Sequence, residues 1–303
     1  MFDLISIGGI SIDLYFKGST LTYKNNRFQL AVGGKYISEK FYTGVGGGGA
    51  NVAIGVRKHG LKSAVMGKIG NNIFKKIIIE KLHEMRIDYH LCDIEDNYYN
   101  VSSILLTPQG ERSIVHYVTP HGSLVSDNNT LASISKTKMV YLGNLPDISI
   151  TQRIELMRFF RMKQIPIVIN LGVNDCRRPL SHLLTLLDQA NIIVLNDHEF
   201  AELVKAPYQD IHFKENVIKW YIPKLSDQVV IVTRGAKGSF AYFNNEVIFQ
   251  EAINIREITD TTGGGDGFTS GFIAGYIKEG NISHAMKSGA LYASKILQKI
   301  GAN

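Results

Sequence analysis

The sequence predicts an α/β protein built around a mostly parallel sheet. From residue 138 onward, short apolar runs alternate with stretches of helical pattern. Continuous apolar runs are typical of parallel strands that are covered on both faces. Earlier in the chain, polar and aromatic segments indicate exposed antiparallel strands. We therefore expect one α/β domain over residues 1–303, with a β-rich appendage formed by two separate segments, 14–43 and 89–120.

The elements of the first half follow in order along the chain. We expect a buried strand over 4–8, a helix over 51–58, a strand over 63–66, and a helix over 74–85, where apolar residues recur with helical spacing. Residues 102–106 and 113–118 flank a Pro-Gln-Gly turn, which predicts a hairpin.

The second half has a more regular rhythm. Its mostly apolar runs predict strands over 139–142, 165–171, 192–195 and 229–233, with helical stretches between them. Two helices, about 264–279 and 281–299, are expected to close the domain.

Composition and charge narrow the class of protein. The net charge of +6 is spread out, without a block of like charges, which disfavours a nucleic-acid partner and suits a small acidic ligand better. The two cysteines form no metal-binding or disulfide pattern, and the first residues lack the features of a signal peptide. No apolar run reaches the roughly 18 residues of a membrane span. We expect a cytoplasmic protein without membrane or nucleic-acid partners.

The segment Asp260-Thr261-Thr262-Gly263-Gly264-Gly265-Asp266 carries the strongest chemical signal, because it leads directly into a predicted helix. Glycines allow a sharp turn there, and the amides at a helix N-terminus favour negative charge. Asp266 would repel an anion, so we infer that it handles a proton; helix capping is the alternative. After it, Gly267, Gly271 and Gly275 leave a stripe without side chains, which predicts a closely packed neighbour.

A second glycine run, from Gly44 to Asn51, also leads into a predicted helix. It matches the dinucleotide pattern G-x-G-x-x-G, yet no acid follows between Val45 and Ile79 to bind a ribose. A polar ligand is the better reading, with Asn51 offering both a donor and an acceptor to a hydroxyl. Asp13, shortly after the first strand, could accept hydrogen bonds from a sugar diol; a solvated loop residue is the alternative.

Two further motifs follow predicted strands. Asn196 and Glu199 are three residues apart and could hold a hydrated Mg²⁺, or simply cap the next helix. The segment Thr233-Arg234-Gly235-Ala236-Lys237-Gly238 could bring backbone close to a nucleotide, or form a plain turn. The sequence contains no P-loop motif.

Together these motifs resemble those of the ribokinase-like, phosphofructokinase-B type carbohydrate kinases, over nearly the whole chain. The amino-terminal signature reads Gly47-Gly48-Gly49-Ala50-Asn51, with Gly60 and Gly70 after it. The carboxy-terminal signature runs from Asp260 to Asp266, with Gly264 in place of an alanine. The Asn-x-x-Glu at Asn196 and the glycine turn at Gly235 lie between them in the expected order.

The resemblance implies a Rossmann-like three-layer sandwich with a small β-sheet lid, which is where the two β-rich segments would belong. It implies that Asp266 is the general base and that the amides of Gly263, Gly264 and Gly265 hold the moving phosphoryl charge. The acceptor would be bound by Asp13, Gly47, Gly48 and Asn51 together with Asp266. ATP would be bound by Asn196, Thr233, Gly235, Lys237 and Gly238, with Mg²⁺ held through water by Asn196 and Glu199.

The resemblance also implies a monovalent-cation site in some members, at Asp260 and Thr262. Further ligands there follow a Gly-Ala pair, and because this sequence ends at Gly301-Ala302-Asn303 we expect an incomplete cation loop. The expected activity is transfer of a phosphoryl group from ATP to a hydroxymethyl group of a small sugar. A nucleoside kinase and a non-catalytic sugar or nucleotide sensor are the alternatives. Free edges of the lid strands make a homodimer through the lid a further expectation.

Overall fold

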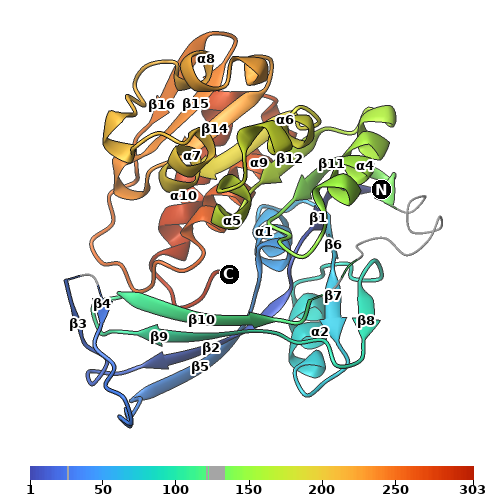
Figure 1. Ribbon diagram of the computed structural model, residues 1–303. Helices are drawn as coiled ribbons and strands as arrows, with labels where there is room; N and C mark the ends of the chain where they lie inside the picture. Colours follow the sequence, from blue (N-terminus) through green and yellow to red (C-terminus); the bar gives the residue numbers. More distant parts are fainter. Residues whose placement is uncertain (26, 121, 123–133) are drawn as a thin grey trace.

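A central eight-stranded sheet organises the larger part of the molecule (Figure 1). The computed structural model describes residues 1–25, 27–120, 122 and 134–303; residue 26, within the expected segment 14–43, lies outside them. From edge to edge the strands are β16 (Glu246–Gln250), β15 (Ser239–Phe243), β14 (Val229–Thr233), β13 (Ile192–Asn196), β12 (Ile167–Asn170), β11 (Thr137–Leu142), β1 (Phe2–Ile7) and β6 (Ser63–Met66).

In this order the strands from β6 to β14 are parallel to their neighbours, and β15 pairs antiparallel with both β14 and β16. The predicted mostly parallel sheet is thereby confirmed. Successive residues of these strands point to opposite faces, and both faces are apolar. Leu4 belongs to the core on one face of the sheet and Ile5 to the core on the other.

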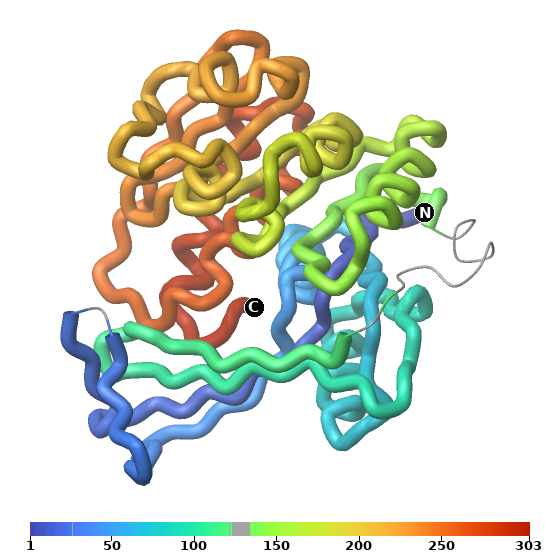
Figure 2. Tube along the Cα trace, in the orientation of Figure 1, coloured from blue at the N-terminus to red at the C-terminus, as the bar shows by residue number. Residues whose placement is uncertain are grey.

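Helices cover both faces of the sheet and give the predicted three-layer sandwich (Figures 1 and 2). On one face lie α1 (Gly48–Lys58), α9 (Gly264–Glu279) and α10 (Ile282–Ile296). On the other lie α4 (Ile150–Met162), α6 (Leu180–Leu187), α7 (Asp197–Val204) and α8 (Val217–Tyr221). The segments between residues 208 and 237 also contain short 3₁₀ turns: η1 (Tyr208–Asp210), η2 (Pro223–Leu225) and η3 (Gly235–Lys237).

A second sheet, which we call the lid, lies across from the carboxyl end of the first (Figure 1). Its order is β10 (Arg112–Val118), β9 (Asn100–Leu106), β2 (Ser11–Lys17) and β5 (Lys40–Gly46). A two-stranded piece, β3 (Tyr23–Lys24) with β4 (Arg27–Phe28), extends from its outer end. Beside the lid, α2 (Lys75–Glu84) packs near β7 (Lys68–Gly70) and β8 (Asp93–Glu95).

The glycine stripe on α9 allows α10 to approach very closely, as the sequence predicts. A Cβ atom on Gly271 would lie 2.7 Å from the carbonyl oxygen of Ser288 and 3.0 Å from the Cα of Gly289. On Gly275 it would lie 3.0 Å from the Cα of Ala285. Since such distances are below contact, any side chain there would push the two helices apart. The helix that follows the glycine loop is thus held firmly against its neighbour.

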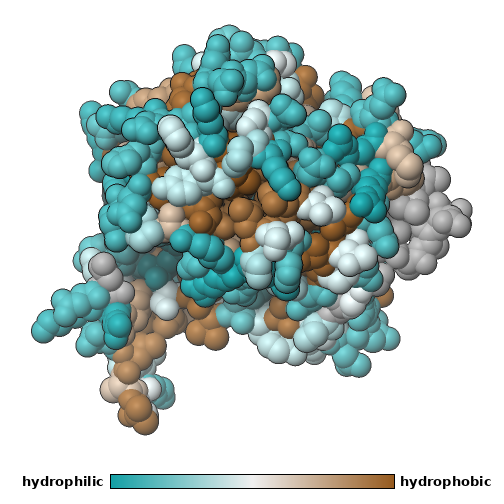
Figure 3. Space-filling model, turned by 45° about the horizontal axis from the view of Figure 1, so that its top comes forward, coloured by the Kyte–Doolittle hydropathy of each residue, from teal (hydrophilic) through white to brown (hydrophobic). Residues whose placement is uncertain are grey.

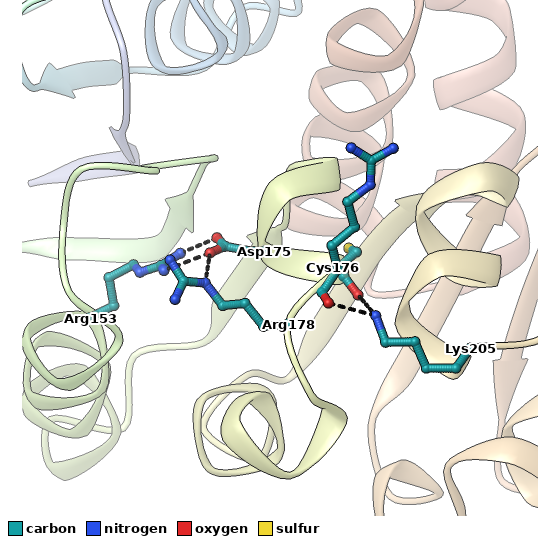
Figure 4. Close-up of polar contacts among 6 residues, drawn as sticks. Arg153, Asp175, Cys176, Arg178 and Lys205 are labelled. Carbon is teal, nitrogen blue, oxygen red and sulfur yellow. Dashed lines mark hydrogen bonds and ion pairs between the residues drawn. The ribbon is translucent and has the colours of Figure 1, made fainter.

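An ion pair fixes α5 (Val173–Cys176), the short helix that follows β12 (Figure 4). Arg153 of α4 donates from Nη1 and Nη2 to the two carboxylate oxygens of Asp175, at 2.5 and 3.0 Å. Arg178 donates to the same carboxylate at 3.2 Å, while Lys205 binds the carbonyl oxygens of Cys176 and Arg177 at 3.0 and 2.8 Å. Arg153 and Asp175 are each 1% exposed, so this pair is part of the interior.

Candidate active site

A cavity of about 450 Å³ lies between the lid and the carboxyl ends of the sheet strands. Its floor includes Gly47, Gly48, Asn51, Gly263 and Asp266. Its roof is formed by lid side chains that alternate along β9 and β10, namely Ser102, Ile104, Ile114, His116 and Val118. Both predicted glycine segments therefore reach one cavity, at the edge of the sheet where α/β proteins bind their ligands.

Asp266 lies in the first turn of α9 and faces this cavity. The helix N-cap is Gly263, whose φ of 77° is left-handed, and no side chain caps the helix. The capping alternative for Asp266 is therefore wrong. The first N–H groups of a helix have no partner inside it, so the amides after Gly263 are available to an anion beside the Asp266 carboxylate.

The environment of Asp266 favours proton uptake. Burial raises the pKa of its carboxyl group, a hydrogen bond from Asn51 lowers it, and the nearby charge of Asp13 raises it again. Within the described residues, no salt bridge involves Asp266. The carboxylate thus lies at a cavity wall with a raised pKa, which suits a general base.

Asn51, in α1, donates from Nδ2 to Oδ2 of Asp266 at 2.8 Å. Its own Oδ1 accepts a hydrogen bond from Asn303 at 3.0 Å. The sequence indicates Asn51 as a ligand for a substrate hydroxyl. The structure shows that its amide also holds the candidate base, a contact across 215 positions of sequence that no local pattern reveals.

Asp13 lies on β2 of the lid and is 6% exposed. Ser11, on the same face of the strand, donates to its Oδ1 at 3.1 Å. Burial raises the pKa of Asp13, while hydrogen bonds from Ser102 and Ser11 and the nearby His116 lower it. Asp13 is thus a buried acceptor in the roof of the cavity and not a solvated loop residue.

Ser102 and His116 were not indicated by the sequence, although a signal for them exists. The two residues are directly paired across the hairpin of β9 and β10, and the Ser102 hydroxyl lies 3.1 Å from Nδ1 of His116. The predicted hairpin, with its turn at 108–110, implies this register. What the hairpin alone does not imply is the parallel pairing of β9 with β2, which places Ser102 beside Asp13.

The first glycine run makes room for this arrangement. A Cβ atom on Gly46 would lie 2.0 Å from Oδ2 of Asp13, so only glycine leaves space for that carboxylate. Gly47 has a φ of 87° and turns the chain from β5 into α1. A Cβ atom on Gly48 would lie 3.7 Å from Oδ1 of Asp266, which shows that this position borders the candidate base.

Asn196 and Glu199 form a complete capping box at the start of α7. The Asn196 side chain accepts from the Glu199 amide at 2.8 Å, and Glu199 Oε2 accepts from the Asn196 amide at 2.9 Å. The capping alternative is therefore present in the structure. Burial, followed by the charge of Asp266, raises the pKa of Glu199 to about 7, so this carboxylate belongs electrostatically to the same cleft. In the described ranges, no cluster of three or more His, Cys, Asp or Glu could hold a metal ion.

The predicted nucleotide segment lies next to this capping box. Thr233 is paired with Asn196 across β14 and β13, and η3 follows at Gly235–Lys237. The side chain of Lys237 approaches the hydroxyl of Tyr208 at 3.4 Å, and the guanidinium of Arg234 lies 4.4 Å from the centre of the Phe213 ring. None of these residues lines the cavity beneath the lid, and the charge interaction between Glu199 and Asp266 links this region to the cavity.

Asp260 is fully buried and acts as a clasp. It accepts from the amide of Thr262 at 2.8 Å and from the amide of Gly301 at 3.0 Å. Both oxygens are thus used to tie the glycine loop to residues 301–303. The monovalent-cation site that the resemblance assigns to Asp260 and Thr262 stays a prediction.

Comparison with known proteins identifies the family of this chain. Residues 1–303 match the profile of the pfkB family carbohydrate kinases. A 5-dehydro-2-deoxygluconokinase of Listeria monocytogenes is 24% identical, over 98% of this chain and 90% of its own length. Among solved structures, ribokinase of Arabidopsis thaliana complexed with ribose and ATP superposes with a TM-score of 0.81 at 22% identity, over 99% of this chain and 94% of that one. Adenosine kinase of Sinorhizobium meliloti gives 0.81 at 19% identity, over 100% and 95%.

The fold of this chain, with its mostly parallel sheet between helices, is thus the fold of ribokinase-like kinases. This chain belongs to the pfkB family of carbohydrate kinases, which confirms the family, the fold and the enzyme class that the sequence predicts.

Proposed function

We propose that this enzyme transfers the γ-phosphoryl group of ATP to a hydroxymethyl group of a small sugar, with Asp266 as the general base. One observation carries the proposal. The Asp266 carboxylate borders the cavity at the N-terminus of α9, held by Asn51 and without a salt bridge in the described part of the chain. The buried structural carboxylates described above differ from it, since Asp175 is held by two arginines and Asp260 by two backbone amides.

The residues of this chain divide the work of the reaction. Asp266 takes the proton from the acceptor hydroxyl as that oxygen attacks phosphorus. The amides of Gly263, Gly264 and Gly265 stabilise the negative charge on the migrating phosphoryl group. Asp13, Gly47, Gly48 and Asn51 orient the acceptor, and closure of the lid excludes water that would otherwise hydrolyse ATP.

ATP is assigned to the region of Asn196, Thr233, Gly235, Lys237 and Gly238, beside the cavity. Residues fit for Mg²⁺ are present, since the half-buried Glu199 lies close enough to Asp266 for the two charges to repel, and a cation would relieve that repulsion. Asn196 and Glu199 would hold the ion through water, and the ion would neutralise phosphate charge. Asp260 and Thr262 would contribute to a monovalent-cation site if one forms.

A nucleoside kinase is the second candidate, and the composition of the roof favours it. Ile104, Ile114 and Val118 give the cavity an apolar side that would suit a flat nucleobase. Asp13, Ser102 and His116 are the polar side that would suit a sugar diol. Because both surfaces meet in one cavity, direct assay decides between the two acceptors.

The test is ADP release from Mg-ATP with ribose, fructose, 2-keto-3-deoxygluconate, 5-dehydro-2-deoxygluconate and adenosine as acceptors. Saturable ADP release with any sugar supports the proposal, and release with adenosine alone selects the nucleoside kinase. If no acceptor stimulates ADP release although ligands bind by calorimetry, the protein is a sensor. Phosphorus NMR of the product identifies the hydroxyl that has been modified.

The outer face of the lid supports a homodimer in the same proposal. Val115, Tyr117 and Phe41 are 69, 59 and 56% exposed, and hydrophobic residues gather on the projecting arm of the molecule in Figure 3. Light scattering after size exclusion tests this surface, with Val115→Lys expected to yield monomers.

We place the enzyme in the cytoplasm, where ATP is abundant. Cys92 and Cys176 are both free thiols, as is usual in that compartment. None of the described helices is both long and apolar enough to cross a membrane.

A further inference from the structure

Residues 301–303 lie directly beneath the glycine loop. Gly301 is held by its hydrogen bond to Asp260, and Ala302 is 5% exposed. A Cβ atom on Gly263 would lie 2.2 Å from the Cβ of Ala302, so the two segments are in close contact. This packing brings the next side chain, Asn303, into contact with Asn51, which lines the cavity. The end of the traced chain lies between the main sheet and the lid in both ribbon and tube views (Figures 1 and 2).

The Asn303 amide begins a chain of hydrogen bonds that ends at the candidate base. Its Nδ2 donates to the carbonyl oxygen of Val45 at 2.6 Å and to Oδ1 of Asn51 at 3.0 Å. Asn51 in turn donates to Asp266 at 2.8 Å. Val45 belongs to β5 of the lid, so the chain runs from a lid strand to α9.

Donor and acceptor chemistry fixes the orientation of both amides. A backbone carbonyl only accepts, so Asn303 must turn its nitrogen toward Val45. That nitrogen also faces Asn51, so the Asn51 side chain must accept through its oxygen. The Asn51 nitrogen is left facing Asp266, whose carboxylate also only accepts. The two ends of the hydrogen-bond chain, the Val45 carbonyl and the Asp266 carboxylate, can only accept. The two amides between them therefore have one consistent arrangement.

We propose that Asn303 is a positioning residue for phosphoryl transfer, because it locks the Asn51 amide in the orientation that donates to Asp266. Asn51 thereby holds Oδ2 of the carboxylate and leaves Oδ1, on the side of Gly48, to receive the proton of the acceptor. The inference rests on the proposed role of Asp266 as base.

Without Asn303 the Asn51 amide is free to rotate and present its oxygen to the carboxylate. Repulsion would then favour protonated Asp266, since the hydrogen bond from Asn51 lowers the pKa of that group. Among the described residues, the other titratable groups that interact with Asp266 are Asp13 of β2, Glu199 of α7 and Tyr141 of β11. These groups are unchanged in the variants below, so a shift in the pH profile reports the loss of the hydrogen-bond chain from Asn303 to Asp266.

The decisive variant is Asn303→Leu, which keeps the branched shape and the number of heavy atoms of the side chain and removes the donor. Asn303→Ala removes both the branched side chain and the donor. Gln298→Ala is the matched control, since this side chain lies on the same carboxy-terminal segment and donates only to the carbonyl oxygen of Ser294. Each protein is assayed for kcat, for KM of ATP, and for kcat/KM of the acceptor across pH.

We expect both Asn303 variants to lower kcat about tenfold or more, the value of a hydrogen bond that supports a charged group. The KM for ATP should change less than twofold, and the acidic limb of kcat/KM should move to higher pH. Gln298→Ala should behave as wild type. If Asn303→Leu keeps wild-type kcat while Asn303→Ala loses it, the residue acts by packing and the proposal is wrong.

A double-mutant cycle gives a second, independent measure. In an Asn51→Ala background there is no amide to orient, so Asn303→Leu should have less than a twofold further effect. A full, additive loss in that background would show that Asn303 acts by another route and would overturn the proposal.

Carbon-13 NMR separates this proposal from the proposed function. The Asp266 carboxyl signal is assigned by its loss in Asp266→Asn, and its titration should move to higher pH in Asn303→Leu. If that shift occurs but no acceptor is phosphorylated by the wild type, the hydrogen-bond chain stands and the kinase proposal fails. If the wild type is active and Asn303→Leu changes neither the titration of Asp266 nor kcat, the kinase proposal stands and the proposed role of Asn303 is wrong.

Discussion

Asp175 and Asp266 are two acidic side chains at the edge of the same sheet, in opposite surroundings. Asp175 lies between the guanidinium groups of Arg153 and Arg178, in an interior pair that fixes α5 to α4 (Figure 4). Asp266 has an amide from Asn51 and the charge of a second acid, Asp13, nearby. The first arrangement neutralises a buried charge, while the second leaves a carboxylate beside a cavity without a cation. The comparison teaches that the partners of a carboxylate indicate its role better than its burial does.

The largest expected effect comes from removing the reactive carboxylate. Asp266→Asn keeps the shape of the side chain and cannot accept the proton, so we expect kcat to fall by about 10³-fold. Calorimetry should show ATP and acceptor binding nearly unchanged. Loss of binding together with activity would contradict the role of base.

The same substitution should stabilise the fold at neutral pH. Since the folded-state pKa of Asp266 is raised, its contribution to stability is present below the unfolded-state value and is lost as pH rises through the folded-state value. Thermal unfolding at pH 8 should therefore give a higher Tm for Asp266→Asn than for the wild type, with the difference vanishing at low pH.

Removing the other carboxylate, that of Asp175, should lower the stability of the fold and leave kcat unchanged. Asp175→Ala leaves Arg153 buried and unpaired, at an expected cost of about 3–5 kcal/mol in the free energy of unfolding measured with urea. The double variant Arg153→Met with Asp175→Leu should come within about 1 kcal/mol of wild type. Arg178→Ala is the control, because that side chain is 47% exposed and should cost less than about 1 kcal/mol. A kcat that falls in the folded Asp175→Ala protein would place this pair in the catalytic machinery instead.

Glu199 shares features with both Asp175 and Asp266, because it is held by a structural contact in the capping box and also has a raised pKa. Glu199→Gln retains a residue suited to the capping box but removes a carboxylate whose pKa is about 7. The wild-type carboxylate loses stability as pH rises from its unfolded value through about 7, so the variant should be more stable by about 1–2 kcal/mol at pH 8 and equal to wild type at pH 4. Urea unfolding at the two pH values measures this difference. If Glu199 also organises Mg²⁺, the Mg²⁺ concentration for half-maximal activity will rise.

The smallest expected effect concerns the exposed Arg112 of the lid, which donates to the hydroxyl of Thr261 in the glycine loop. Unlike Arg153 it is accessible to solvent, so Arg112→Ala should cost less than about 1 kcal/mol in stability. We expect the acceptor KM to rise about two- to fivefold, since one contact between lid and loop is lost. An unchanged KM would show that this contact does not contribute to closure.

Local patterns explain why much of this molecule is predictable from its sequence. Continuous apolar strands predict the parallel sheet, and the spacing of Gly267, Gly271 and Gly275 predicts the close helix pair. The two glycine segments, with Asp266 and Asn51, predict the location of the site. Each of these signals lies within a few residues of the feature it determines.

The remaining features depend on tertiary closure. The hydrogen bond between Asn303 and Asn51 spans 252 positions, and nothing in the neighbourhood of either residue indicates it. The pairing of β2 with β9 that brings Ser102 to Asp13 is likewise non-local. For Asn196 and Glu199 the limit is different, because the same spacing of three suits a capping box and a metal site, and the box is what the contacts show.

The placement of Asp13 has a consequence for how this enzyme could acquire a new substrate. Asp13 belongs to a strand of the lid, whereas Asp266 belongs to a helix packed on the main sheet. In the proposed roles, part of the acceptor contact therefore lies on the lid, while the proton chemistry lies on the main sheet domain. Exchanging the lid segments for those of a related enzyme would transplant selectivity while the catalytic centre is inherited untouched, which gives such an architecture an easy route to diversify.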